Sequence, residues 1–251
     1  MKLEDRFIGA LQTLPPKPPP TAAARVKGGY SQSMSNVLAS ALGAHLRALG
    51  CKEARPAGPG ELDSSGAERR MAGGIGAKKV DVTWATEEAG LIFASSIKTI
   101  NFQDLKSGNY QKNLTNRRGD MLFEAVTLHR RFPYSVLLGL FFLDIGAASD
   151  GKFKGNRETR KSTFLNAHQR LRLFTGRIDP AGRDEQLETL CVVLVDTAAN
   201  VPTVAAYDVG QPSVPIALED VIDRVMVQVS DRNPDFYEYN LLERKMIRLR
   251  S

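Results

Sequence analysis

One apolar run limits the possible folds of this chain more than any other feature. Tyr134 to Asp144 is almost continuously apolar, and its longest uninterrupted stretch runs from Val136 to Leu143. That stretch is far shorter than the roughly 18 apolar residues of a membrane-spanning helix. A strand that is apolar on both faces is typical of the centre of a sheet with helices packed on each side. The run therefore predicts an α/β architecture with this strand near the middle.

The patterns on either side of the run predict the other elements of such a sheet. Helices are expected over residues 1–14, 31–49, 107–131, 158–175 and 216–227, and strands over 80–84, 91–99, 190–195 and 203–207. The two strands before the run are joined by a short turn at residues 87–90, which is typical of a hairpin. The order of elements predicts a mixed central sheet flanked by helices on both faces.

The domain organisation follows from length and from one proline cluster. The chain has 251 residues, enough for one large domain with a real core. Residues 1–30 are expected to form a short helix followed by an extended connector at Pro15–Pro20. Residues 31–251 are expected to form a single domain, with its core at about 61–145 and further strands and helices at 150–251.

Cysteine usage and the N-terminal segment indicate a cellular compartment. Cys51 and Cys191 are too few for a disulfide framework, and with three histidines they show no zinc-binding spacing. The first residues carry acids and lack the apolar core of a signal peptide. These features favour a cytoplasmic protein with no membrane association.

Positive charge is concentrated in two segments. The formal net charge is +6, but Lys98–Arg131 alone carries +4 and Lys152–Arg177 carries +7, which leaves −5 for the rest of the chain. Two basic segments that flank a buried strand predict a surface for a polyanion such as nucleic acid.

Asp81 and Lys98 are the strongest candidates for chemistry. Asp81 lies in the first strand of the expected hairpin, and Lys98 lies near the end of the second. Pairing of the two strands brings both residues to the open end of the hairpin, where their side chains can converge. A carboxylate beside an ammonium group is suited to metal-assisted hydrolysis of a phosphodiester.

At these residues the sequence resembles the PD-(D/E)xK nucleases, the restriction-endonuclease-like superfamily. Asp81 matches the first acid of the motif, and Ser96-Ile97-Lys98 follows it 15 residues later in place of (D/E)-x-K. Val80 replaces the proline, and Ser96 replaces the second acid. The resemblance covers about residues 31–145 and implies the superfamily's αβββαβ core, with the catalytic core at about 61–145. Some restriction enzymes of the superfamily carry S-x-K and supply the acid from the following helix.

The missing acid therefore has to be sought elsewhere. Glu124 is favoured because it borders the apolar stripe of the helix after the hairpin, although a salt bridge to Arg117 or Arg131 is the alternative. Glu68, just upstream of the Asp81 strand, is a second candidate for an additional ligand. Gln111 lies near the position from which the S-x-K enzymes supply their acid, where it would contact a metal-bound water or DNA.

The resemblance implies an Mg²⁺-dependent DNA endonuclease, with Mn²⁺ as a substitute metal. Asp81, Glu124 and the Ile97 backbone carbonyl would hold the metal, Lys98 would assist the attacking water, and cleavage would leave 5′-phosphate and 3′-hydroxyl ends. A type II restriction endonuclease that acts as a homodimer, beside a cognate DNA methyltransferase, is the leading role. A nonspecific defence-effector or repair nuclease, a DNA-binding protein with a degenerate site, and a module that contacts an acidic protein stay open.

The expected DNA contacts come from amide and basic side chains in the two positive segments. Asn, Gln and Arg can form paired hydrogen bonds with base edges, whereas Lys mostly contacts phosphate. The candidates are Lys106, Asn109, Gln111, Lys112, Asn113, Asn116, Arg117, Arg118, Lys161, Arg170, Arg172 and Arg177.

Overall fold

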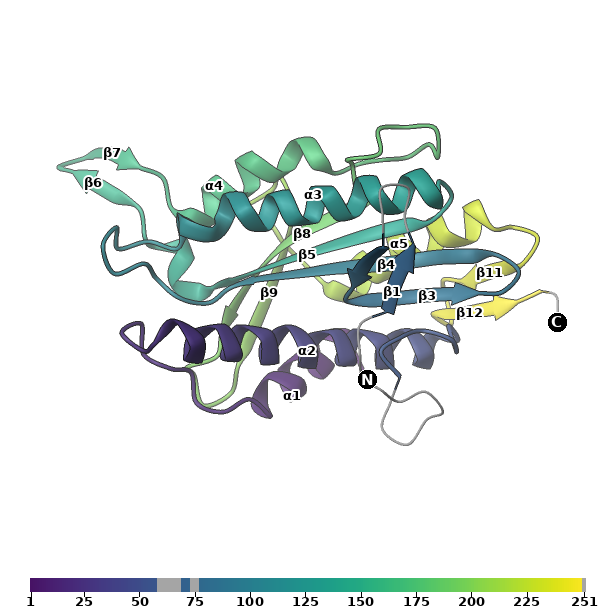
Figure 1. The fold of residues 1–251 in the computed structure, drawn as a ribbon, viewed down its shortest axis with the longest axis horizontal. Helices are drawn as coiled ribbons and strands as arrows, with labels where there is room; N and C mark the ends of the chain where they lie inside the picture. Colours follow the sequence, from purple (N-terminus) through teal and green to yellow (C-terminus); the bar gives the residue numbers. More distant parts are fainter. Residues whose placement is uncertain (58–68, 73–76, 250–251) are drawn as a thin grey trace.

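A six-stranded sheet forms the centre of the protein (Figure 1). The computed structural model of the chain describes residues 1–57, 69–72 and 77–249. The strands run in the order β10-β9-β8-β5-β4-β3. Their bounds are β3 (Val82–Thr86), β4 (Gly90–Ile100), β5 (Val136–Asp144), β8 (Thr189–Asp196), β9 (Thr203–Asp208) and β10 (Pro215–Ile216).

The apolar run forms the central strand, as its composition predicts. All nine residues of β5 are buried. β5 pairs in parallel with β4 on one side and with β8 on the other, whereas β3 and β9 pair antiparallel with the outer sides of β4 and β8. The prediction of an α/β protein with a mixed sheet is confirmed.

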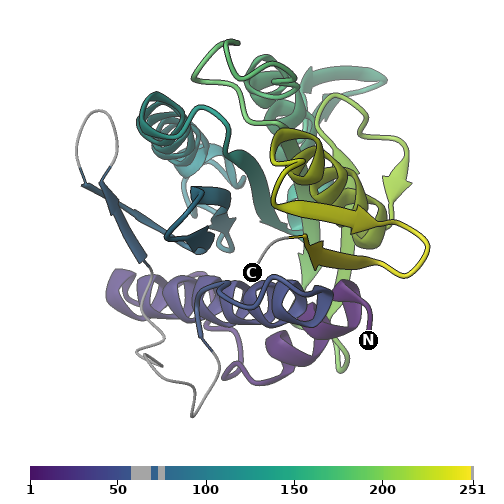
Figure 2. The same cartoon turned by 90° about the vertical axis from the view of Figure 1, so that its right-hand side faces the viewer.

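Helices cover both faces of this sheet, and alternate residues of β5 point into two separate cores. Leu138, Leu140 and Phe142 pack with α1 (Leu3–Gln12), α2 (Ala24–Leu49) and α5 (Leu218–Arg232). Leu137, Phe141 and Leu143 pack on the opposite face with α3 (Leu114–Arg131) and α4 (Thr163–Leu171). Figure 2 shows the sheet between these two helical layers. Within the described residues, no helix is long and apolar enough to cross a membrane.

In the part of the chain that the structure describes, three two-stranded antiparallel sheets lie outside the central sheet. They are β1–β2 (Arg69–Ala72, Ala77–Val80), β6–β7 (Lys152–Lys154, Arg157–Arg160) and β11–β12 (Tyr237–Asn240, Lys245–Arg248). Single turns of 3-10 helix occur at Gln111–Asn113, Ile145–Ala148 and Arg172–Phe174.

The predicted starts of three helices are wrong. The helix expected from Ser107 begins only at Leu114, because Asp104 binds the backbone of Ser107 in a turn and a 3-10 turn follows at Gln111–Asn113. α2 begins at Ala24 rather than Ser31, without a side-chain cap, so the expected division between residues 30 and 31 falls inside a helix. α1 packs its Leu3, Phe7 and Leu11 into the same core as the sheet, so the N-terminal segment is part of the main body. The basic helix expected from Glu158 begins only at Thr163, because the residues before it form β7.

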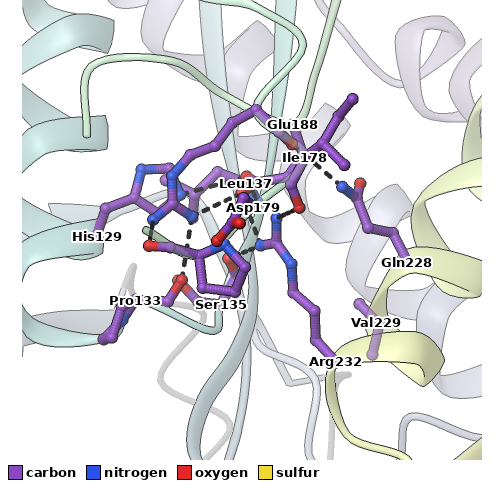
Figure 3. Close-up of polar contacts among 12 residues, drawn as sticks. His129, Pro133, Ser135, Leu137, Ile178, Asp179, Glu188, Gln228, Val229 and Arg232 are labelled. Atoms are coloured by element: carbon purple, nitrogen blue, oxygen red, sulfur yellow. Dashed lines mark hydrogen bonds and ion pairs between the residues drawn. The ribbon is translucent and has the colours of Figure 1, made fainter. Parts of the chain in front are cut away.

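A buried charge cluster joins the segments at one end of the sheet (Figure 3). The Glu188 carboxylate accepts hydrogen bonds from Arg177 at 3.0 Å, from Arg232 at 2.7 Å and from the Leu137 backbone N–H at 2.7 Å. His129 Nε2 lies 3.3 Å from the same carboxylate. The cluster therefore connects α3, β5 and α5 to the segment that leads into β8.

Candidate active site

Asp81 occupies the one-residue break between β2 and β3. β3 then pairs with β4, starting from Val82 opposite Ser95. The Asp81 side chain accepts a hydrogen bond from the backbone N–H of Ile97, with 2.6 Å between Oδ2 and the nitrogen. This bond points the carboxylate across the hairpin toward Lys98.

Lys98 lies between two carboxylates. Its Nζ is 2.9 and 3.0 Å from the two carboxylate oxygens of Glu124 on α3 and 3.8 Å from Oδ2 of Asp81. The three side chains are mostly buried, with exposed fractions of 10% for Lys98, 7% for Glu124 and 15% for Asp81. Asp81, Lys98 and Glu124 therefore meet in space, although they come from three separate parts of the chain.

Ser96 has a role that the sequence does not reveal. Its hydroxyl donates to Glu124 Oε2 at 2.5 Å, so a side chain of β4 contacts the carboxylate on α3. Glu124 is thus held from two sides, by Ser96 and by Lys98. Of the two arginines predicted as alternative partners, Arg117 pairs with Asp120 at 3.6 Å. The ion pair of Glu124 that the structure shows is with Lys98.

The cluster opens into a cleft of about 860 Å³. Asp81, Lys98 and Glu124 line it together with the segment after β4, the start of α3 and the N-terminal part of α2. The sequence does not predict that α2 lines the cleft, because the expected start of that helix, Ser31, lies beyond several of its cleft residues. Its residues at the cleft are Ala24, Lys27, Gly28, Ser31, Gln32 and Ser35. The sequence feature that could have indicated an exposed helix face here is the run of small and polar residues in this segment.

The donor set fits a hard divalent cation such as Mg²⁺. This ion is usually held by one or two carboxylates and completes its shell with water and substrate phosphates. Asp81 and Glu124 supply two carboxylates, and the Ile97 carbonyl is the predicted third oxygen. Among the described residues, no group of three or more His, Cys, Asp or Glu side chains is placed to hold a metal. Glu68, the other predicted acid, lies outside the described residues.

Ten of the twelve predicted DNA contacts fall into three groups. Lys106, Lys112, Asn113 and Arg117 line the cleft. Asn116, Lys161, Arg170 and Arg172 are exposed on the helical layer of α3 and α4, and Arg170 donates to the Thr115 hydroxyl. Gln111 and Arg118 are half-buried: the Gln111 amide donates to the Lys161 carbonyl, and the Arg118 guanidinium lies over the Phe174 ring.

Two predicted DNA contacts are instead structural. Arg177 is 2% exposed and donates to Glu188 and to the Pro133 carbonyl, so its charge is neutralised inside the protein. Asn109 is 6% exposed, and its side-chain oxygen accepts from the backbone N–H of Gln111. Neither side chain is available to DNA, because each is committed to contacts within the fold.

Asp104 fixes the shape of the rim of the cleft. Its carboxylate accepts from Lys112 Nζ at 3.0 Å and from the backbone and side chain of Ser107. The hydrogen bond from Lys112, followed by those from Ser107, lowers the pKa of Asp104 to about 2. Asp104 is therefore ionised at neutral pH and holds the loop between β4 and α3 in a closed turn.

Comparison with known proteins found no match for this chain among protein families, curated proteins or solved structures.

Proposed function

We propose that this protein is a metal-dependent endonuclease that hydrolyses phosphodiester bonds in DNA. The observation that carries the proposal is the convergence of Asp81, Lys98 and Glu124 at the floor of one cleft. Glu124 lies 26 residues beyond Lys98, yet both of its oxygens are within 3.0 Å of the lysine Nζ. An acid supplied by the following helix is what the S-x-K variant of the PD-(D/E)xK motif requires.

Each residue of the site has a separate role in the proposed reaction. Asp81, Glu124 and the Ile97 carbonyl hold the metal, and Ser96 orients Glu124. Bound Mg²⁺ supplies positive charge that favours attack on the phosphate. Lys98 stabilises developing negative charge or positions the attacking water, and the products carry 5′-phosphate and 3′-hydroxyl ends.

The leading biological role is restriction-type cleavage of foreign DNA in the cytoplasm. Cutting both strands of a duplex needs two sites, which favours a homodimer. The order of α2, the strands up to β4, α3 and β5 supports a restriction-endonuclease-like core. A DNA methyltransferase encoded beside this protein would support the restriction role over that of a nonspecific nuclease.

One observation favours a second candidate, a DNA-binding protein with a degenerate site. Lys98 contacts both oxygens of Glu124 and lies near Asp81, so the three groups also form a complete structural ion-pair cluster. In that case the site stabilises the sheet and does no chemistry.

Plasmid cleavage separates the two candidates. The purified chain is incubated with supercoiled plasmid and Mg²⁺ or Mn²⁺, beside Asp81→Ala, Lys98→Ala and Glu124→Gln. Asp120→Asn is the matched control, because Asp120 lies one helical turn from Glu124 and lines the same cleft. Cleavage by the wild type and the control, and loss of at least about 10²-fold in the three site variants, is expected.

Metal binding gives an independent measurement. Calorimetric titration with Mn²⁺ should show a site that Glu124→Gln weakens and Asp120→Asn does not. DNA binding without cleavage in either metal would overturn the nuclease proposal and support the degenerate site. Cleavage that survives all three site variants would show that the site is elsewhere.

A further inference from the structure

We propose that the β6–β7 hairpin contacts double-stranded DNA by reaching into its major groove. The inference rests on the proposed nuclease function and deepens it, because it assigns duplex recognition to an element outside the cleft. No part of this hairpin belongs to the Asp81–Lys98–Glu124 site.

The hairpin is fixed to the rim of the cleft. Arg160, the last residue of β7, donates to the backbone carbonyls of Ser107 at 3.1 Å, Gly108 at 3.5 Å and Asp150 at 2.6 Å. Ser107 and Gly108 belong to the loop between β4 and α3, and preceding residues of that loop line the cleft. In Figure 1 the hairpin projects from the same end of the molecule as this loop and the beginning of α2. DNA in the cleft would therefore pass beside it.

The hairpin places like charges directly opposite one another. Lys154 pairs with Arg157 across the ladder, and Lys152 pairs with Arg160. Such cross-strand pairs are destabilising, and a two-stranded hairpin on its own is only marginally stable in water. A bound polyanion removes this repulsion. The arrangement therefore fits binding to an anion better than it fits a purely structural role.

These charges are available to a partner. Lys152, Lys154 and Arg157 are exposed, and within the described part of the chain none of them forms an ion pair. By contrast, the nearby cations Lys112 and Arg117 are paired with Asp104 and Asp120. With Glu158 as its single acid, the hairpin keeps a net positive charge, and it adds to the cations Lys27 and Lys106 that line the cleft.

The shape and the remaining side chains favour duplex DNA. The major groove admits a two-stranded β-ribbon, and strand cations can then contact the phosphates on its edges. Phe153 is 67% exposed, and an exposed apolar group suits contact with a thymine methyl group. Asn156 is exposed between the two strands, where its amide can pair with an adenine edge.

The test compares two triple variants of the full chain. The first is Lys152→Ala/Lys154→Ala/Arg157→Ala. The matched control is Lys52→Ala/Arg131→Ala/Arg183→Ala, which removes the same charge from exposed positions outside the hairpin. Binding to a short labelled duplex, and to one of its single strands, is measured by fluorescence anisotropy in EDTA over a salt series. Plasmid cleavage is measured separately with Mg²⁺.

The hairpin variant is expected to bind the duplex on the order of 10²-fold more weakly near 0.1 M salt, with a salt slope smaller by about 3. The control should change far less, and the single strand should be affected less than the duplex. Unchanged duplex affinity in the hairpin variant, or an equal loss on the single strand, would overturn the inference while cleavage by the wild type still supported the proposed function. Duplex binding that depends on the hairpin, without cleavage, would support the inference and overturn the nuclease.

Discussion

Ser96 contacts the carboxylate on which the proposed chemistry depends. Its hydroxyl donates a hydrogen bond to Glu124 at 2.5 Å. Ser96→Ala should remove this hydrogen bond and give the Glu124 carboxylate more freedom to rotate. We expect kcat to fall about tenfold with little change in KM, because only positioning is lost.

Ser95→Ala is the matched control for this change. Ser95 is the adjacent buried serine, and its hydroxyl has no hydrogen-bond partner among the described residues. Cleavage kinetics of the two variants should therefore differ. Equal kcat values for Ser96→Ala and the wild type would show that the contact does not position Glu124.

His168 gives the fold a dependence on acid. Burial lowers its pKa to about 4 from an ordinary value near 6.5, and its Nδ1 accepts from the backbone N–H of Gly210. The unfolded chain binds a proton below about pH 6.5 and the folded chain does not, so stability should fall as the pH drops from about 6.5 to 4. The free energy of unfolding should fall by about 3 kcal/mol over this pH interval.

Urea unfolding at several pH values measures this effect. His168→Asn keeps a polar acceptor without a titrating ring, so its stability should decline less over the same interval. Parallel pH profiles for His168→Asn and the wild type would contradict the assignment.

At the scale of elements, the end of α2 depends on a glycine. Gly50 has φ of 113°, and a side-chain carbon added there would collide with the backbone carbonyl of Met246 in β12. Gly50→Ala should lower the free energy of unfolding by about 2–4 kcal/mol, through backbone strain and separation of β12 from the helix.

Gly155 at the tip of the β6–β7 hairpin is the control. It also has positive φ, at 59°, but an added carbon would meet nothing within 4 Å. Gly155→Ala should cost only about 1 kcal/mol. Chemical denaturation measures the free energy of unfolding of both variants. Equal losses for Gly50→Ala and Gly155→Ala would show that the contact with Met246 is unimportant.

Elements with a strong apolar pattern were predictable, and those governed by charge were not. β5 and the β3–β4 hairpin follow from runs and alternation that match the spacing of a strand. The basic stretch before Thr163 resembles a solvated helix, yet it forms a hairpin, because charge alone does not distinguish the two. The placement of Glu124 beside Lys98 agrees with the prediction, whereas the burial of Arg177 depends on Glu188, a partner that no local pattern indicates.

For the whole molecule, the cluster around Glu188 connects both helical layers to the sheet (Figure 3). Burial raises the pKa of Glu188, but His129, Arg232 and the Leu137 N–H more than offset this and hold the pKa below its usual value. Glu188→Gln would leave Arg177 and Arg232 buried without an anion. We expect a loss of about 3–5 kcal/mol in the free energy of unfolding.

Glu185→Gln is the control for charge removal, because Glu185 is partly exposed and its ion pair among the described residues is with exposed Arg183. Glu185→Gln should change the free energy of unfolding by no more than about 0.5 kcal/mol. Since the pKa of Glu188 is lowered, its contribution should be complete above the unfolded value and disappear as the pH falls through the folded one. A Glu188→Gln protein as stable as the wild type would show that the cluster does not hold the segments together.

The buried charge cluster and the cleft lie at opposite ends of the three parallel strands, β4, β5 and β8. The Glu188 cluster lies where β5 and β8 begin, whereas the residues that follow β4 at its other end line the cleft. Substitutions at the cleft and in the β6–β7 hairpin therefore leave the buried ion pairs of Glu188 intact. Side chains that line the cleft can therefore be exchanged without exposing or unpairing the buried charges, whereas a change at the opposite end of the sheet leaves a buried arginine without its anion.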